Sequence, residues 1–420
     1  MVNRNVAPHF VKPEFFPLTE ANSTILAGGV NLHIVNSGDT ELLRLEIIFK
    51  AGKWYQQKKG QAVLTSKMLL EGTKSFNSEN ISQIFETNGA FFEISCGMDF
   101  VNFTVYCINR NLTKLLPVIF EIINEPTFPE KEFLLAKDIQ IQNLKVNLKK
   151  NNFLTSRIFK RNLFGGIHPY GTAIEINDIE ALTKTDLQDY YKQFIQNDFE
   201  VVVAGKLNSE DEGNLISFFQ QFRTNEVLFK RDNTSVTLSN PQYLEIDDSL
   251  QTSIKIGSKV FHKSDPRYFH LLIFNEILGG YFGSRLMQKI REEKGYSYGI
   301  HSAINQNIHD AYFFISTEVI KKHKNDAIKS IYGEIENLIY NRVSQEEFNT
   351  VVNYFKGSFL SSINSPFALA DKFKNLYFNN LTYNYYQSLF EELDAMSPDS
   401  LHAFANDYFS NLKFTEVSVG

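Results

Sequence analysis

Two segments of this chain repeat one pattern of hydrophobic and polar positions. Residues 182–205 (LTKTDLQDYYKQFIQNDFEVVVAG) and 396–420 (MSPDSLHAFANDYFSNLKFTEVSVG) each begin with helix-capping residues and carry aromatic residues at helical spacing. Each segment then ends in a strand that closes on glycine, and these glycines, Gly205 and Gly420, are 215 positions apart. The spacing predicts that one structural design is used twice.

A second correspondence supports this duplication. Residues 84–92 (IFETNGAFF) match residues 290–298 (IREEKGYSY) at an offset of 206, through Gly89 and Gly295. In both halves an apolar strand leads to a helix, and a second helix, a hairpin, long helices and a closing helix and strand follow. This order predicts an α+β fold with two homologous layered domains, each a mostly antiparallel sheet with helices packed on one face.

The predicted boundaries follow from a change in composition near the middle of the chain. Residues 222–240 are polar and irregular in pattern, and Pro241 follows them. We therefore expect an N-terminal domain over 1–221, a linker over 222–240 and a C-terminal domain over 241–420. The first strand and the first helix of each half are expected at 42–50 and 60–70, and at 253–261 and 266–278.

The stretch 279–300 (GGYFGSRLMQKIREEKGYSYGI) predicts a helix that runs directly into a strand. Ser284 is the expected N-cap of the helix. Arg291 and Tyr298 lie seven positions apart at the predicted corner. A guanidinium offers a fork of charged donors and a phenol offers one O–H on a stiff ring, so both can address one carbonyl oxygen. The repeat aligns these two residues with Phe85 and Phe92, so the duplicated scaffold itself does not require a charge or a phenol there.

Composition and charge exclude several classes of protein. With 43% hydrophobic and 21% charged residues, the chain of 420 residues is ordinary globular material, and its net charge of -6 argues against binding nucleic acid. Cys96 and Cys107 fall on a predicted hairpin at positions that do not face each other, which indicates free thiols and a reducing compartment. The sequence contains no signal-peptide pattern and no run of eighteen apolar residues, so we expect a cytoplasmic protein without a membrane partner.

Two other patterns carry no chemistry. Residues 295–299 match G-x-S-x-G, but a nucleophile elbow needs a strand before its serine and a helix after it, and the order here is reversed. No two of the nine histidines lie three or four positions apart, so no helix presents two imidazoles to one metal ion.

The stretch 278–300 closely resembles the C-terminal signature of the pitrilysin/insulinase-like metallopeptidases, whose zinc motif is the inverted H-x-x-E-H. The resemblance covers essentially the whole chain and implies a zinc helix over 60–73 (GQAVLTSKMLLEGT). Its chemistry is absent: the histidine positions hold Val63 and Lys67, the general-base position holds Ser66, and the third ligand falls near Asn143. Valine cannot coordinate zinc and a protonated lysine repels it, so this chain is expected to bind no metal.

The resemblance also implies a role for Arg291 and Tyr298. In bacterial members of the family with two subunits, the zinc-free subunit supplies an Arg and a Tyr that reach the substrate at the zinc site of the other. The resemblance therefore implies a non-catalytic subunit of a heterodimeric zinc peptidase that degrades unfolded peptides. Its Tyr298 would donate to the oxyanion while Arg291 holds the substrate, and zinc is expected in the partner subunit. The alternative is a structural or peptide-holding scaffold, similar to the zinc-free core proteins of respiratory complexes, which needs neither residue.

Overall fold

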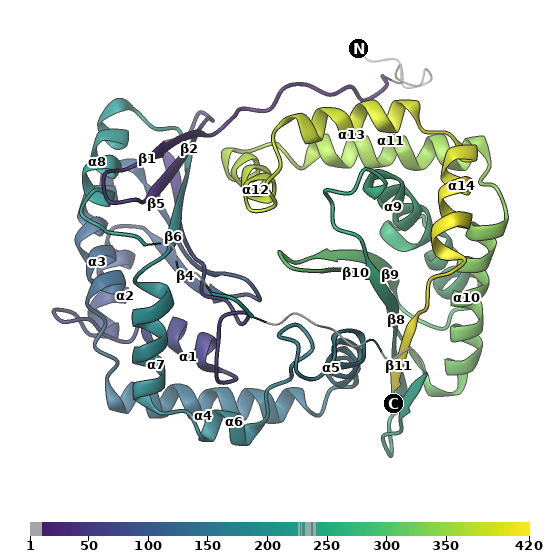
Figure 1. Cartoon of the computed structure of the whole chain (residues 1–420), viewed down its shortest axis with the longest axis horizontal. Coiled ribbons are helices and arrows are strands. Elements are labelled where there is room, and N and C mark those ends of the chain that lie inside the picture. Colours follow the sequence, from purple (N-terminus) through teal and green to yellow (C-terminus); the bar gives the residue numbers. More distant parts are fainter. Residues whose placement is uncertain (1–10, 226, 228, 232–236, 238–240) are drawn as a thin grey trace, which may run out of the picture.

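The computed structural model describes residues 11–225, 227, 229–231, 237 and 241–420. Two sheets face each other near the middle of the molecule, and most helices lie on their outer sides (Figure 1). Within the described ranges, the helices lack the combination of length and apolar character that crossing a bilayer requires.

The first sheet has six strands in the order β1-β2-β6-β3-β5-β4. Strands β2 and β6 run parallel, and the other neighbouring pairs are antiparallel. The strands are β1 (Asn22–Ile25), β2 (Asn31–Asn36), β3 (Leu42–Phe49), β4 (Phe91–Cys96), β5 (Val101–Ile108) and β6 (Phe199–Gly205). The helices of this half are α1 (Gln61–Met68), α2 (Ser78–Thr87), α3 (Leu112–Asn124), α4 (Glu130–Asn147), α5 (Asn151–Phe164), α6 (Ile176–Glu180), α7 (Lys184–Tyr190) and α8 (Ser209–Phe219), with a 3-10 turn η1 (Asn109–Asn111) and a π-helical turn η2 (Tyr191–Ile195).

The second sheet has five strands in the order β7-β11-β8-β10-β9. Strands β7 and β11 run parallel, and the other pairs are antiparallel. The strands are β7 (Gln242–Leu244), β8 (Gln251–Val260), β9 (Ile300–Gln306), β10 (Ala311–Ile320) and β11 (Thr415–Val419). The helices are α9 (Tyr268–Asn275), α10 (Lys324–Tyr340), α11 (Gln345–Ser361), α12 (Pro366–Tyr377), α13 (Asn384–Ala395) and α14 (Pro398–Phe409), with π-helical η3 (Glu276–Gly280) and η4 (Met287–Glu293) and a 3-10 turn η5 (Lys321–His323).

The two sheets share one topology. Strands β2, β6, β3, β5 and β4 occupy the places of β7, β11, β8, β10 and β9, and β1 is an additional edge strand. The repeated closing segments fold as predicted, because Thr183 caps α7 and Ser397 caps α14 through their side chains, and the strands β6 and β11 follow. The predicted α+β fold with two sheets is therefore confirmed, and the strands expected at 42–50 and 253–261 are β3 and β8.

In each half, one helix packs on the inner face of the sheet that belongs to the other half. Helix α12 of the second half packs on β2 and β6, and α5 of the first half packs on β8 and β11 (Figure 1). The first residues of these helices, Asn151 and Pro366, are 215 positions apart, so the duplicated units exchange equivalent helices. The sheets are thus covered on both faces, which adds one helix per sheet to the layering expected from the sequence.

The side chains of β6 point alternately into two different hydrophobic cores, as the exchange of helices requires. Val201 and Val203 belong to the core of the first half, whereas Val202 and Ala204 belong to the core formed with the second half. Because successive side chains of a strand point to opposite faces, one continuous apolar run can serve two cores. This explains why every residue of β6 is buried.

Charged side chains also join α12 to the first sheet. Arg44 on β3 donates to Asp371 over 2.8 Å, and Lys374 donates to Glu46 over 2.6 Å. Arg44 and Glu46 are almost fully buried, so both charges need partners there. The two halves are held by paired charges as well as by apolar contacts.

The segment before β1 lies along the second half (Figure 1). Lys12 forms an ion pair with Asp394 on α13, and the amide of Ala21 donates to the hydroxyl of Tyr383 over 2.9 Å. The domain boundaries at 221 and 241 stay a prediction, since the expected linker 222–240 lies partly outside the described residues.

Candidate functional site

The corner between η4 and β9 holds Arg291 and Tyr298. The helix reaches this corner in π-helical form, and the amide of Lys294 donates to the carbonyl of Lys289 five residues earlier. Gly295 has φ +63, a left-handed conformation that favours glycine, and the chain reverses there toward the strand. π-Helical turns are frequent at functional sites, and this one places Arg291 in its last turn.

The loop after Gly295 is fixed on both sides of Tyr298. The Tyr296 ring stacks on His323, with ring centroids 4.2 Å apart. The hydroxyl of Ser297 donates to the carbonyl of Gly299 over 2.7 Å, and the hydroxyl of Thr317 on β10 lies 2.9 Å from Ser297 Oγ. The serine of the G-x-S-x-G pattern is therefore a turn residue. The residues on either side of Tyr298 thus anchor the loop to η5 and β10.

The side chain of Tyr298 projects from this anchored loop into solvent, with 95% of the residue's surface exposed. Arg291 is half-buried, and its guanidinium lies over the ring of Phe282, 4.7 Å from the centroid. The neighbouring cations Arg285 and Lys289 instead form ion pairs with glutamates. The structure thus places both predicted residues at one corner, with the guanidinium packed on an aromatic ring and the phenol in solvent.

The register of the sheets corrects one alignment made from the sequence. Val203, Leu45, Val105 and Phe92 lie side by side across the first sheet. The equivalent positions across the second sheet are Ser418, Ile254, Thr317 and Ile300. Phe92 therefore corresponds to Ile300 and not to Tyr298, so the alignment of Tyr298 with Phe92 is wrong.

The physical reason is an insertion in the corner. Phe92 follows Gly89 by three positions, whereas Ile300 follows Gly295 by five, and both glycines have positive φ. The second half therefore has two additional residues between its glycine and its strand. Tyr298 belongs to this longer loop, which explains its exposure. Phe92 instead lies on β4 and packs against the ring of Phe85 on α2, with the ring centroids 4.3 Å apart.

The expected N-cap Ser284 is also wrong in its chemistry. Ser284 precedes the first helical residue, and its carbonyl accepts from the amide of Gln288. Its side-chain oxygen is buried without a hydrogen-bond partner among the described residues, so it does not cap the helix.

Helix α1 is the predicted zinc helix. It begins after Gly60, which has φ +87, and lies between its sheet and α4. The hydroxyl of Ser66 is buried and donates to the carbonyl of Val63 over 2.9 Å, and Lys67 Nζ donates to Gln140 Oε1 over 3.3 Å. A hydrocarbon, a hydroxyl bound to its own helix and an ammonium group do not fit zinc.

The expected third ligand position, Asn143, does not contact the predicted zinc helix in the structure. Asn143 is exposed on α4, whereas Gln140, about one helical turn earlier, contacts Lys67 on α1. The assignment of the third ligand position near Asn143 therefore stays a prediction, and Gln140 is the residue of α4 whose contact with Lys67 the structure shows. The described residues contain no cluster of three or more His, Cys, Asp or Glu side chains that could hold a metal ion.

Family models match both halves of the chain. The model described as insulinase (peptidase family M16) matches residues 34–165, and the model described as the peptidase M16 inactive domain matches residues 181–355. The first match contains α1 with its lost zinc chemistry, and the second contains the corner with Arg291 and Tyr298.

Curated relatives and solved structures are similar over most of the chain. The non-peptidase homolog YmxG of Helicobacter pylori is 22% identical over 392 residues, which cover 89% of this chain and 88% of the relative. An uncharacterized zinc protease YmxG of Bacillus subtilis is 19% identical over 354 residues, which cover 82% of this chain and 84% of the relative.

Two solved structures show the same fold. The crystal structure of a peptidase M16 inactive domain from Pseudomonas fluorescens matches with a TM-score of 0.87 and 22% identity, over 95% of this chain and 98% of that chain. A protease from Helicobacter pylori matches with a TM-score of 0.84 and 18% identity, over 96% and 99% of the two chains. The two family matches together span most of the sequence, and the chain belongs to the insulinase family of peptidases, family M16.

Proposed function

We propose that this chain is the non-catalytic subunit of a heterodimeric zinc peptidase. In this proposal Tyr298 and Arg291 act at the zinc site of a homologous partner subunit, and the substrate is an unfolded peptide. The observation that carries the proposal is the contrast between two elements: helix α1 is intact without metal ligands, whereas the loop of Tyr298 is anchored and presents an exposed phenol.

The chemistry required of Tyr298 is hydrogen-bond donation. A tetrahedral intermediate places negative charge on one oxygen, and a donor already fixed in position stabilises that charge without reorganisation. The bond between Thr317 and Ser297 supports such preorganisation, because it fixes the residue before Tyr298. Arg291 is held by Phe282 at the same corner and would bind the carbonyl of the substrate.

The coarser part of the proposal is supported by similarity. Residues 181–355 match the model of an inactive domain, and the relative from Helicobacter pylori carries the name of a non-peptidase homolog. A scaffold without a role in peptide hydrolysis would fit this similarity too. The exposed Tyr298 favours the peptidase subunit, because an exposed phenol contributes little to folding.

The test is reconstitution with a homologue that carries the intact H-x-x-E-H motif. The two purified proteins are assayed alone and mixed, with a quenched fluorescent peptide as substrate and size-exclusion chromatography to detect the complex. We expect activity only in the mixture, together with a complex of both chains. A homologue that is as active alone as in the mixture would refute the subunit role.

A further inference from the structure

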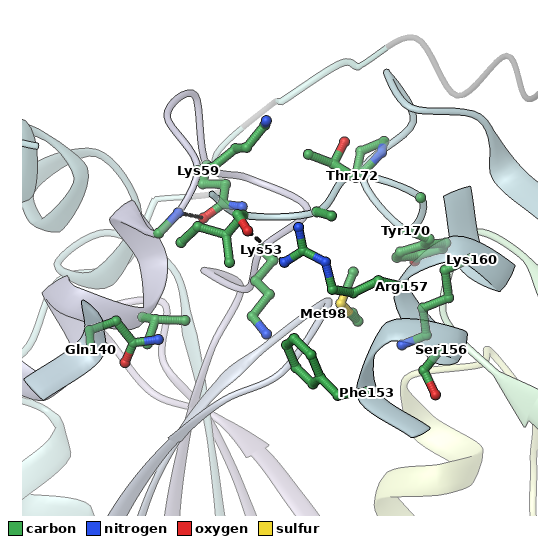
Figure 2. A pocket seen from close by; sticks show the side chains of 17 residues that line it. Lys53, Lys59, Met98, Gln140, Phe153, Ser156, Arg157, Lys160, Tyr170 and Thr172 are labelled. Atoms are coloured by element: carbon green, nitrogen blue, oxygen red, sulfur yellow. Dashed lines mark hydrogen bonds between the residues drawn. The ribbon is translucent and has the colours of Figure 1, made fainter. Parts of the chain in front are cut away.

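Beside the lost zinc helix lies a cavity of about 350 Å³ (Figure 2). Val63 on α1 and Gln140 on α4 form one side, α5 forms the opposite side, and residues 169–174 close a third side. None of the residues in this cavity belongs to the corner of Arg291 and Tyr298. The cavity is therefore a second candidate site in the chain.

The lining is basic. Its 17 residues include four cations, Lys53, Lys59, Arg157 and Lys160, and no Asp or Glu (Figure 2). These cations come from two parts of the chain: Lys53 and Lys59 from the segment before α1, and Arg157 and Lys160 from one face of α5. A concave surface lined by charges of one sign concentrates ligands of the opposite sign.

Two of the four cations are already paired. Lys59 lies 3.2 Å from Asp178, and Arg157 lies 2.5 Å from Glu175. Lys53 and Lys160 form no ion pair with any carboxylate of the described residues. The cavity thus contains two ammonium groups whose charges the described part of the chain does not neutralise.

The electrostatics of Lys160 favour binding of an anion. Burial lowers the pKa of Lys160, and the charge of Lys53 lowers it further. Lys255, whose amino group donates to Ser156 of the lining over 3.0 Å, has its pKa lowered to about 8 by burial and then by Lys160. Lys160 is thus repelled by Lys53 on one side and by Lys255 on the other, and a bound anion would relieve that repulsion.

The remaining lining is mainly apolar, with Val63, Met98, Phe153, Pro169 and Ile174 among its residues. An apolar wall next to unpaired cations fits a ligand that has a hydrophobic body and one anionic end. The C-terminal residues of a peptide have this form, since a side chain and a carboxylate lie side by side. Free phosphate would use the cations and leave the apolar wall without a contact.

We infer that this cavity binds the C-terminal carboxylate of a short peptide with an apolar last residue, and that Lys53 and Lys160 hold the carboxylate. The inference rests on the proposed peptide-handling role for its choice of ligand. It places a peptide terminus beside helix α1, where this chain has no hydrolytic chemistry of its own. The chain would therefore bind a peptide end without cleaving it.

The test is isothermal titration calorimetry on the isolated full chain. The probe is a hexapeptide with an apolar C-terminal residue, used as the free acid and as the C-terminal amide. We expect the acid to bind and the amide to bind at least about tenfold more weakly, because charge-assisted hydrogen bonds to the carboxylate are lost. An amidated peptide that ends in glutamate separates a side-chain carboxylate from the terminal one.

The variants Lys53→Met and Lys160→Met locate the site. Each should weaken binding of the acid at least about tenfold. The control is Lys131→Met on α4, outside the cavity, where the lysine side chain is 90% exposed; this variant should leave binding unchanged. Thermal unfolding should show that Lys160→Met is no less stable than the wild type, because a buried, repelled charge is removed.

Four outcomes would overturn the inference: no binding of the acid, equal affinity for acid and amide, equal affinity for the amide that ends in glutamate, or inorganic phosphate binding as tightly through the same lysines. The titrations need no partner subunit. A failure of the reconstitution assay would therefore leave their result intact, and the two proposals fail separately.

Discussion

The hydroxyl of Thr317 lies 2.9 Å from the hydroxyl oxygen of Ser297, and this contact ties the loop of Tyr298 to strand β10. Thr317 also lies 2.9 Å from the carbonyl oxygen of Gly299, so one side chain holds both ends of the segment that contains Tyr298. Thr317 is 4% exposed, so the contacts are made from a buried side chain of the sheet. The position of an exposed phenol is thus determined by a buried hydroxyl.

Thr317→Val removes that hydroxyl and keeps the shape of the side chain. We expect the free energy of unfolding to fall by about 1 kcal/mol and kcat of the reconstituted heterodimer to fall roughly tenfold, because the phenol is less well positioned. Urea unfolding and steady-state kinetics measure the two effects. Thr317→Ser should restore kcat, since it restores the hydroxyl. If kcat stays low in Thr317→Ser, the effect is not due to this hydrogen bond.

Tyr298→Phe tests the chemistry directly. The residue is 95% exposed, so the free energy of unfolding should stay within about 0.5 kcal/mol of the wild type. If the phenol stabilises the oxyanion, kcat of the heterodimer should fall roughly 10²–10³-fold, as for other single donors in oxyanion holes. Tyr340→Phe, a change at another exposed tyrosine on α10, is the matched control. A Tyr298→Phe heterodimer with wild-type kcat would leave the scaffold alternative as the better explanation.

The duplicated architecture could be predicted because the sequence patterns that indicate it each lie within one short segment of the chain. The capped helices before β6 and β11, and the glycines that close these strands, lie within single segments. The exchange of α5 and α12 between the halves is not local. Phe159 on α5 packs with Val417 on β11, and no period along either segment states which sheet a helix will cover.

The candidate site was predicted in part for the same reason. Seven positions separate Arg291 from Tyr298 on any alignment, so their presence at one corner could be read from the sequence. The insertion before Ile300 changes the register and becomes visible only when strand pairs are compared. The contact between Lys67 and Gln140 depends on the angle between two helices, which residue spacing does not determine.

The contact between Lys67 and Gln140 predicts which residue of α4 could serve as a zinc ligand if the metal site were rebuilt. The wild-type protein, purified without chelator, should contain no stoichiometric zinc by elemental analysis, because Val63, Ser66 and Lys67 provide no ligand set. The variant Val63→His/Ser66→Glu/Lys67→His with Gln140→Glu should bind about one zinc ion per chain, since position 140 faces position 67. The same triple change with Asn143→Glu is the comparison. Zinc bound through residue 143 but not through residue 140 would contradict the geometry of α4.

Acid should loosen the contact between the halves through Asp371. Burial alone would raise the pKa of Asp371, but the hydrogen bond from Arg44 and the charge of Lys374 outweigh burial and bring that pKa below its usual value. The unfolded chain, with an ordinary pKa of about 3.9 for this carboxyl, therefore takes up the proton at a higher pH than the folded chain does. The stability contributed by Asp371 is complete above about pH 4 and is lost as the pH falls through the folded-state pKa.

Asp371→Asn removes this contribution. The variant should be less stable than the wild type at pH 7, and its stability should decline less between about pH 5 and pH 3. The effect is modest because the Asp371 side chain is 56% exposed and salt screens part of the attraction. Urea unfolding at a series of pH values measures it, with Asp39→Asn at an exposed position as the control. If Asp371→Asn declines as steeply as the wild type, the contacts of Arg44 with the carbonyl of Phe367 and of Lys374 with Glu46 hold α12 on the first sheet without Asp371, and the acid sensitivity must come from other carboxylates.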